Sequence, residues 1–400
     1  MATTYRAISG GLAGALILSS AGLVQVTADR QGAKAAAIKF RAEQVASDFG
    51  VGYAVVTGDV NADKRTDILA INATDLVWFE SPGWQKQVIV SGATVRDNVT
   101  LAPHDVDGDG RLDVALGAGW TGANTGTLQW VRQNAPGSTP AWEVFQISAE
   151  PTLHRIRWAD VDGDKRLELV VAPLHGKDNK GPAWQGVGAR LLIFRPPANP
   201  RADPWPVEVA DEANHIMHNF LGVNLDTDAQ DELVTASREG LFAIKRDKSG
   251  KWARTQLGEG APGEVKLGRV GGRRMFATVE PWHGASVVIY VERPGLWSRT
   301  VIETGLTGGH ALGWADFDGD GNDELAVGWR DQKPGLAVYA VTADGALGSK
   351  LMIDEGGMAT EDLVIADLNG DKQPDIVASG RATRNVKIYW NETRAPAAPK

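Results

Sequence analysis

The chain of 400 residues has no cysteine and carries a formal net charge of −9. The absence of cysteine excludes disulfides, thiolate metal sites, cysteine nucleophiles and a lipid anchor on cysteine. Because the sequence is acidic and has no basic stripe, we expect no nucleic-acid partner. Hydrophobic residues make up 43% and charged residues 23% of the chain, which is typical of a globular protein.

Long hydrophobic runs are also scarce, and one uncharged stretch near the N-terminus is the exception. It follows Arg6 and reads "AISGGLAGALILSSAGLVQVTA". Val26 and Ala28 are small residues at the spacing that a signal peptidase requires, so we expect a signal peptide over 1–28 and a single domain over 29–400. The protein would then be periplasmic or extracellular, with no stable membrane span after cleavage. An uncleaved membrane anchor is the alternative.

What the chain has in abundance is a repeated acidic loop. It occurs at residues 59–67, 105–113, 160–168, 224–232, 316–324 and 367–375, and a seventh copy at 270–278 has lost its acids. The copies are roughly 45–65 residues apart, which is the spacing of propeller blades. Short apolar runs before and after each loop predict four strands per copy.

The fourth run follows the loop in only six copies, and the segment 38–46 precedes the first copy. An N-terminal strand can therefore complete the last blade and leave no open sheet edge. We predict an all-β fold, a seven-bladed β-propeller of four-stranded blades whose ring is closed by that strand. The tryptophans that lead the fourth runs are expected to pack between blades; they are Trp84, Trp142, Trp205, Trp252 and Trp297.

Four of the loops carry a full set of oxygen-bearing side chains. Such a set gathers several carboxylates around one point, which suits a hard cation such as calcium or magnesium. The alternative is an Asp-rich turn without an ion, in which the carboxylates cap their own backbone. The predicted structural cation ligands are Asp105, Asp107, Asp109, Asp113, Asp160, Asp162, Asp164, Glu168, Asp316, Asp318, Asp320, Glu324, Asp367, Asn369, Asp371 and Asp375. The pattern resembles the FG-GAP and VCBS repeats of integrin heads and secreted bacterial proteins.

The histidines follow a register of their own. Six residues before each loop the chain has Tyr53, Val99, His154, His218, Glu264, His310 and Glu361. Six residues of strand cover about 20 Å, so these side chains lie far from the acidic loops, at the opposite end of the innermost strand. Strand starts from all blades meet at one mouth of a propeller. We therefore predict that these residues gather around one rim.

The turns after the second strands return to the same mouth. "APLHG" and "EPWHG" place His175 and His283 at matching positions, and Trp120, Arg330 and Arg381 fall nearby. His215 is a further candidate, whereas His104 directly precedes a loop and belongs to the far end. The alternative is that these are ordinary solvated loop residues. Five histidines in register on one rim favour a functional site.

Imidazoles and carboxylates together suit a transition metal or general acid–base catalysis near neutral pH. "HRIRWADVDGD", "APLHG", "EVKLG", "EPWHG" and "GHALGWADFDGD" resemble the propeller part of aldos-2-ulose dehydratases. The resemblance implies β-elimination on an oxidised sugar by a carbon–oxygen lyase. In that family cupin-type domains add an isomerisation, for which we expect no counterpart in this chain.

The resulting hypothesis is a secreted lyase that uses a zinc or manganese ion to polarise a keto sugar. We assign the metal to His154, His218, His310 and Glu264, catalysis to His175, His283, Tyr53 and Glu361, and substrate binding to Trp120, Arg155, Arg330 and Arg381. One alternative is a non-enzymatic binding or adhesion propeller. A second is a polysaccharide lyase that acts on uronides.

Overall fold

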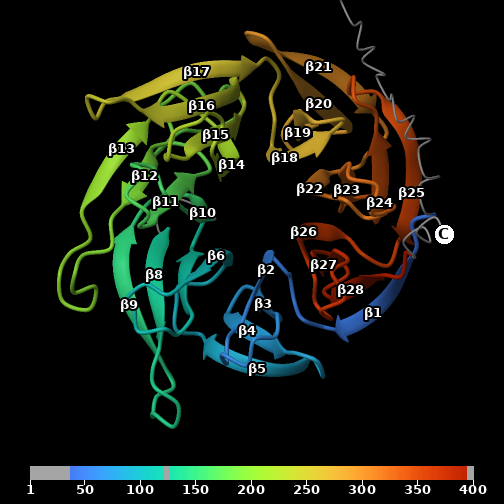
Figure 1. The fold of residues 1–400 in the computed structure, drawn as a ribbon. Coiled ribbons are helices and arrows are strands. Elements are labelled where there is room, and N and C mark those ends of the chain that lie inside the picture. The colour runs from blue at the N-terminus through green and yellow to red at the C-terminus, as the bar shows by residue number, and fades with distance from the viewer. Residues whose placement is uncertain (1–36, 121–125, 394–400) are drawn as a thin grey trace, which may run out of the picture. The chain divides into compact units, whose positions relative to one another are not determined.

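The computed structural model describes residues 37–120 and 126–393, and within these ranges the regular structure is entirely β. Seven antiparallel sheets of four strands each are arranged as blades around a central axis (Figure 1). The strands are β1 (Phe40–Ala46), β2 (Ala54–Gly58), β3 (Asp67–Ile71), β4 (Asp75–Glu80), β5 (Gln85–Ser91), β6 (Asn98–His104), β7 (Asp113–Ala118), β8 (Thr127–Gln133), β9 (Trp142–Ala149), β10 (Leu153–Ala159), β11 (Glu168–Pro173), β12 (Leu191–Phe194), β13 (Val207–Asp211), β14 (Met217–Val223), β15 (Glu232–Ser237), β16 (Gly240–Arg246), β17 (Trp252–Gly258), β18 (Glu264–Val270), β19 (Arg273–Glu280), β20 (Ser286–Arg293), β21 (Leu296–Glu303), β22 (Gly309–Ala315), β23 (Glu324–Trp329), β24 (Gly335–Val341), β25 (Leu347–Glu355), β26 (Thr360–Ala366), β27 (Asp375–Gly380) and β28 (Val386–Asn391).

The ring closes as the repeat count predicts. The innermost strands β2, β6, β10, β14, β18, β22 and β26 each contact the next, and β26 contacts β2. Blade 7 is made of β26, β27 and β28, and its fourth strand is β1 from the start of the described chain. Phe40 pairs with Asn391 and Gln44 with Lys387. The prediction of a seven-bladed propeller closed by an N-terminal strand is confirmed.

The core lies between neighbouring blades. Second strands such as β11 are buried along their whole length, because both of their faces are covered by adjacent sheets. Each hydrophobic cluster draws from more than one blade: Ile68 of blade 1, for example, packs with Val377 and Ile388 of blade 7. The predicted tryptophans take part in these clusters, Trp84 in the one just described, and Trp205 is itself almost fully buried.

The strand direction fixes which residues share a mouth. In blade 3, His154 is the second residue of β10, and the acidic loop begins at Asp160 directly after that strand. Antiparallel pairing of Leu153 with Pro173 brings the end of β11 back beside the start of β10. The strand starts and the turns that carry His175 and His283 therefore lie at one end of the blades, and the acidic loops at the other.

The predicted signal peptide over 1–28 lies outside the described residues. The described residues belong to one compact unit, which contains the propeller. Within the described ranges, no helix is long and apolar enough to cross a membrane.

Candidate functional site

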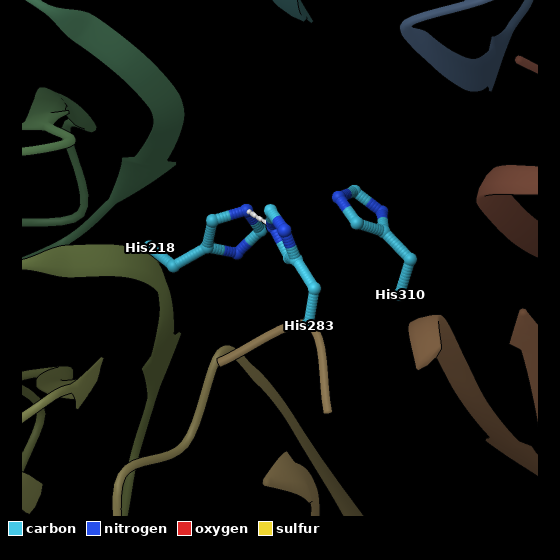
Figure 2. Close-up of side chains that lie close together, drawn as sticks. All are labelled: His218, His283 and His310. Carbon is cyan, nitrogen blue, oxygen red and sulfur yellow. Dashed lines mark hydrogen bonds between the residues drawn. The ribbon is translucent and has the colours of Figure 1, made fainter. Parts of the chain in front are cut away.

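Three histidines from three successive blades converge at the mouth where the inner strands begin. His218 is the second residue of β14, His310 is the second residue of β22, and His283 lies in the turn after β19. Their ring nitrogens lie within 4.8 Å of one another (Figure 2). The Nε2 atoms of His218 and His283 are 2.6 Å apart. We call these three residues the histidine triad.

Neighbouring blades fix the tautomers of two triad members. The Nδ1–H of His218 donates to the carbonyl oxygen of Gly263 at 2.6 Å, and the Nδ1–H of His310 donates to the carbonyl oxygen of Glu361. A carbonyl oxygen can only accept, so each Nδ1 must carry the proton. The lone pair of each ring is therefore on its Nε2 atom. Metal-binding histidines commonly have this arrangement, in which the second ring nitrogen donates to the main chain.

His283 is oriented differently, by Arg330. The guanidinium of Arg330 donates to Nδ1 of His283 at 3.1 Å and to the carboxylate of Glu361 at 2.5 Å. Because Arg330 has only donors, Nδ1 of His283 accepts and Nε2 carries the proton. This Nε2–H donates to His218 and completes a chain of hydrogen bonds from Arg330 through two imidazoles to a main-chain carbonyl.

Burial keeps the triad neutral. It lowers the pKa of His218 and His310 well below the usual value for histidine, and nearby cationic and imidazole groups lower it further. For His283, burial is the largest cause, followed by the charge of Arg330, and the pKa falls to about 3. All three rings are therefore uncharged at neutral pH, which is the form that binds transition metals.

The two predicted glutamates lie in different surroundings. Glu361 accepts hydrogen bonds from Arg330 and from Arg381, the latter at 2.9 Å, and its Oε1 lies 3.9 Å from Nε2 of His310. Glu264 instead accepts from Lys266 at 2.8 Å and from Asn219. The carboxylate beside the triad is thus that of Glu361.

His154 lies next to the triad, with its ring 4.6 Å from that of His218. Its Nδ1–H donates to the carbonyl oxygen of His218 at 3.0 Å, as in the triad. Its Nε2, however, accepts from the guanidinium of Arg155 at 3.3 Å. The lone pair of His154 is therefore already in use, as is that of His218, which accepts from Nε2–H of His283. Arg155 itself is almost fully buried.

An aromatic wall continues from His154 along blades 1 and 2. Trp120 packs edge-on against His154 with ring centroids 5.5 Å apart, and Tyr53 packs on Trp120 at 6.2 Å. The guanidinium of Arg381 lies over the Tyr53 ring at 5.6 Å. Burial, and then the charge of Asp97, raise the pKa of Tyr53, so its hydroxyl keeps its proton at neutral pH.

The remaining histidines are outside the triad. The ring of His175 packs on Trp184 at 5.0 Å, and its Nδ1 bonds the carbonyl oxygen of Gly176. His215 pairs with Glu239 through Nδ1 at 3.0 Å. His104 ends β6 beside an acidic loop, as its position in the sequence predicts.

Sequence reasoning missed three residues at this mouth. Trp282 lies beside His218 and His283, with its ring centroid 6.2 and 5.3 Å from theirs. Trp184 packs against Trp282, and Asn219 donates to Glu264. The motif "EPWHG" contained a signal for Trp282, because it places a tryptophan directly before His283. The loop that carries Trp184 has no counterpart in the other repeats, so no register could have predicted its position.

Comparison with known proteins agrees with this architecture. Residues 125–293 match the family model of the aldos-2-ulose dehydratase β-propeller domain, and residues 59–116 and 316–378 match an FG-GAP-like repeat. Aldos-2-ulose dehydratase of Phanerodontia chrysosporium is 24% identical over 338 residues, which cover 74% of this chain and 36% of that protein. The chain is a seven-bladed β-propeller that is similar in part to FG-GAP-like repeats and in part to the propeller domain of aldos-2-ulose dehydratase. It corresponds to about a third of the length of that relative.

A solved structure of a lectin from Agrocybe aegerita, described as recognising non-reducing terminal N-acetylglucosamine, also aligns with the chain. Its TM-score is 0.49 at 12% identity, and the alignment covers 79% of this chain and 81% of the lectin.

The dehydratase match at 125–293 contains four of the predicted rim histidines, and the second FG-GAP match contains Glu361.

The acidic loops of the propeller are built as capped turns with clustered carboxylates. In blade 6, Asp316 accepts the main-chain N–H groups of Gly319 and Gly321 at 2.7 and 2.9 Å. Carboxylate oxygens of Asp316, Asp318 and Asp320 nevertheless lie within 4.8 Å of one another. Burial, followed by repulsion from the neighbouring aspartates, raises the pKa of Glu324 to about 8. The capped turn and the carboxylate cluster thus coexist in one loop.

Three blades supply a positive charge to their own loop from the third strand. The residue opposite the last acid of the loop is Arg132 in blade 2, Arg195 in blade 3 and Lys245 in blade 4. Arg132 contacts Asp107 at 2.6 Å. Lys245 lies among three carboxylates, at 2.5 Å from Asp226, 2.8 Å from Asp228 and 2.5 Å from Glu232. These three acids have the spacing of a metal site, but the ammonium group already occupies the space between them.

Blades 6 and 7 lack such a residue. The equivalent positions are Ala340 and Trp390. Among the described residues, no basic side chain forms an ion pair with the acids of the loops at 316–324 and 367–375. In blade 5 the charges are exchanged, since Arg274 in the loop pairs with Glu292 on the third strand. Neutralisation by a protein side chain therefore differs from blade to blade.

Proposed function

We propose that this protein is a carbohydrate dehydratase that eliminates water from an oxidised sugar, with a divalent metal ion at the histidine triad. The observation that carries the proposal is the convergence of three neutral imidazoles at the mouth of the propeller. The similarity to the dehydratase propeller supports a sugar as the substrate. The coarser statement, that the chain contains a carbohydrate-related propeller, rests directly on that similarity.

The chemistry of the triad fits a zinc or manganese ion. His218 and His310 carry their lone pairs on Nε2, and that of His218 accepts a hydrogen bond from Nε2–H of His283 that a bound metal would replace. Three imidazoles with an open fourth position are the usual donor set of a catalytic zinc site. His283 would first have to move its proton to Nδ1 and release Arg330. When bound, the metal supplies Lewis acidity that polarises the keto oxygen and makes the neighbouring C–H bond acidic.

Glu361 is the residue that we assign to proton transfer. Its carboxylate is held by Arg330 and Arg381 and lies beside the triad. It takes the proton from the carbon next to the keto group and delivers it to the hydroxyl on the following carbon. The C–H and C–O bonds break, a carbon–carbon double bond forms, and water leaves.

The charged and aromatic residues around the triad would orient the sugar. Arg330 and Arg381 have further N–H groups that can donate to sugar oxygens, while Trp120 and Tyr53 present ring faces and edges. We further propose that the protein acts in the periplasm or outside the cell. This part of the proposal rests on the sequence of residues 1–28.

We also propose that calcium or magnesium binds the acidic loops that lack a basic partner. The loop at 316–324 is the strongest candidate, because its clustered carboxylates have no ion pair among the described residues. Hard cations favour such all-oxygen sites. The role of the ion would be structural, at the end of the blade opposite to the triad.

A substrate panel tests the elimination. Keto sugars and uronides are incubated with the protein, with and without a chelator, and enone formation is followed by ultraviolet absorbance. We expect an enone from keto sugars, its loss on chelation, and zinc or manganese by elemental analysis. His310→Ala and His283→Ala should each reduce the rate by at least about 100-fold and lower the metal content. His283 is half-buried, so His283→Ala should disturb folding less than His310→Ala does. The matched control is His104→Ala, at the opposite end of the blades.

The outcomes separate the alternatives. An enone from uronides alone would replace the proposal with a polysaccharide lyase. No enone from either class, with no transition metal bound, would leave a non-enzymatic binding propeller. Full activity of both triad variants would remove the triad from the reaction.

A further inference from the structure

An aromatic cleft opens beside the triad, at His218. It has a volume of about 290 Å³ and is lined by segments of blades 3, 4 and 5. Trp184 comes from the turn between β11 and β12, Arg238 from the turn between β15 and β16, and Trp282 from the turn after β19. His218 forms part of its wall, so a molecule in the cleft would touch the triad directly. We call this feature the tryptophan cleft.

The two indoles form a corner. The rings of Trp184 and Trp282 are 6.3 Å apart at their centroids and stand at 74° to each other. Both are half-buried, so each keeps accessible surface, and Pro262 and Ile216 complete an apolar wall. A pyranose ring has apolar C–H faces and a polar rim, and apolar walls with a few placed polar groups are the typical lining of a small-molecule site.

Two side chains of the cleft, Trp282 and Arg238, supply hydrogen-bond donors. Nε1 of Trp282 is buried and has no hydrogen-bond partner within the described ranges. A buried N–H without an acceptor is costly, and native structures rarely keep one. Arg238 uses one N–H to bind the carbonyl oxygen of Ala183 at 2.5 Å and has others to offer. A suitable ligand must therefore bring oxygen acceptors, as a sugar does.

We propose that the tryptophan cleft is a subsite for a second sugar residue, linked to the one that lies at the triad. The inference rests on the proposed function, because it takes the triad as the place of the reacting ring. The cleft is at the lower end of the usual size of ligand pockets, so it has room for about one ring. The substrate would then be an oxidised oligosaccharide or glycoside, and not a free monosaccharide.

Binding measurements test the subsite without requiring turnover. Isothermal titration compares glucose with maltose, cellobiose, isomaltose and gentiobiose on the full chain. We expect at least one disaccharide to bind at least 10-fold more tightly than glucose. Trp184→Ala should reduce its affinity to that of glucose, whereas Trp184→Phe should retain most of the preference. Trp142→Ala, which removes a half-buried tryptophan from blade 2, is the matched control and should change neither affinity.

Two results would overturn the subsite: no disaccharide binds more tightly than glucose, or Trp184→Ala keeps the full preference while remaining folded by circular dichroism. The elimination can fail separately. If no keto sugar yields an enone but the Trp184-dependent preference is present, the cleft is a sugar site and the proposed reaction is wrong. If an enone forms and Trp184→Ala has the kcat/KM of wild type on both mono- and disaccharide substrates, the elimination is supported and the subsite is excluded.

Discussion

Replacing Lys245 with methionine tests whether its ammonium group takes the place of a metal ion in the acidic loop of blade 4. The ammonium of Lys245 contacts Asp226, Asp228 and Glu232, the acids that in other blades would surround an ion. These contacts raise the pKa of Lys245, so it is charged throughout the accessible pH range. Methionine keeps a flexible, unbranched side chain of similar length but removes the charge. The variant leaves three carboxylates facing one another.

The size of the effect follows from the exposure of the partners. Asp226 and Asp228 have side chains that are 52% and 50% exposed, so each of their pairs contributes only about 0.2–1 kcal/mol. Glu232 is buried, with a side chain 5% exposed, and a hydrogen bond between charged groups there contributes about 1.5–3 kcal/mol. We expect a loss of about 2–5 kcal/mol, the sum of these contributions. With an unfolding entropy of about 2.1 cal/mol/K per residue over about 350 residues, Tm falls by about 3–7 °C.

The assay is thermal unfolding of wild type and Lys245→Met in a chelator and in millimolar calcium. Without Lys245, the three clustered carboxylates have the composition of a calcium site. A ligand at 100 times its Kd stabilises a protein by about 2.7 kcal/mol, so calcium should restore most of the lost Tm. Wild type can respond through blades 6 and 7, and the relevant quantity is the extra response of the variant. Lys248→Met, at an exposed position in the same blade, is the control.

The reasoning fails if Lys245→Met is as stable as wild type in the chelator, since the ammonium would then contribute nothing. It also fails if calcium raises the Tm of both proteins equally, because the vacated acids would then not be a cation site. A response of Lys248→Met equal to that of Lys245→Met would indicate a general charge effect.

Two further predictions concern the triad and blade 6. Glu361→Gln should lower kcat by about 10²–10⁴-fold, the usual contribution of a general acid–base group, with little change in bound metal. Steady-state kinetics and elemental analysis check this, and an unchanged kcat would exclude Glu361 from proton transfer. Asp318→Asn should remove the blade 6 part of the calcium stabilisation, about 3–4 °C for one site at 100 times Kd, because it removes a carboxylate from that cluster. A calcium response equal to that of wild type in thermal unfolding contradicts the blade 6 site.

The sequence was sufficient to predict the fold because the repeat specifies it many times over. Each loop marks the hairpin between an inner strand and the next, and the missing fourth strand at the end requires β1 to close the ring. The same register placed His154, His218 and His310 at one end of the inner strands and His104 at the other. Strand periodicity carries this information, because a side chain's distance along a strand follows directly from residue count.

Contacts between side chains of different blades could not be predicted from the sequence. In the sequence, His154, His218 and His310 occupy equivalent positions. In the structure, the third member of the triad is His283, and the lone pair of His154 accepts a hydrogen bond from Arg155. Glu264 and Glu361 also occupy equivalent positions, and only the location of Lys266 and Arg330 in space distinguishes them.

What the sequence alone determined is therefore the architecture and the end of each strand at which a residue lies. Tertiary structure decided which residues meet: the triad, the tryptophan cleft, and the insertion of Lys245 between carboxylates from a loop that ends 13 positions earlier in the chain. The physical reason is that periodicity fixes position along a strand and the face it occupies. Pairing register, loop course and rotamer choice, which bring distant side chains within bonding distance, depend on the packed ring as a whole.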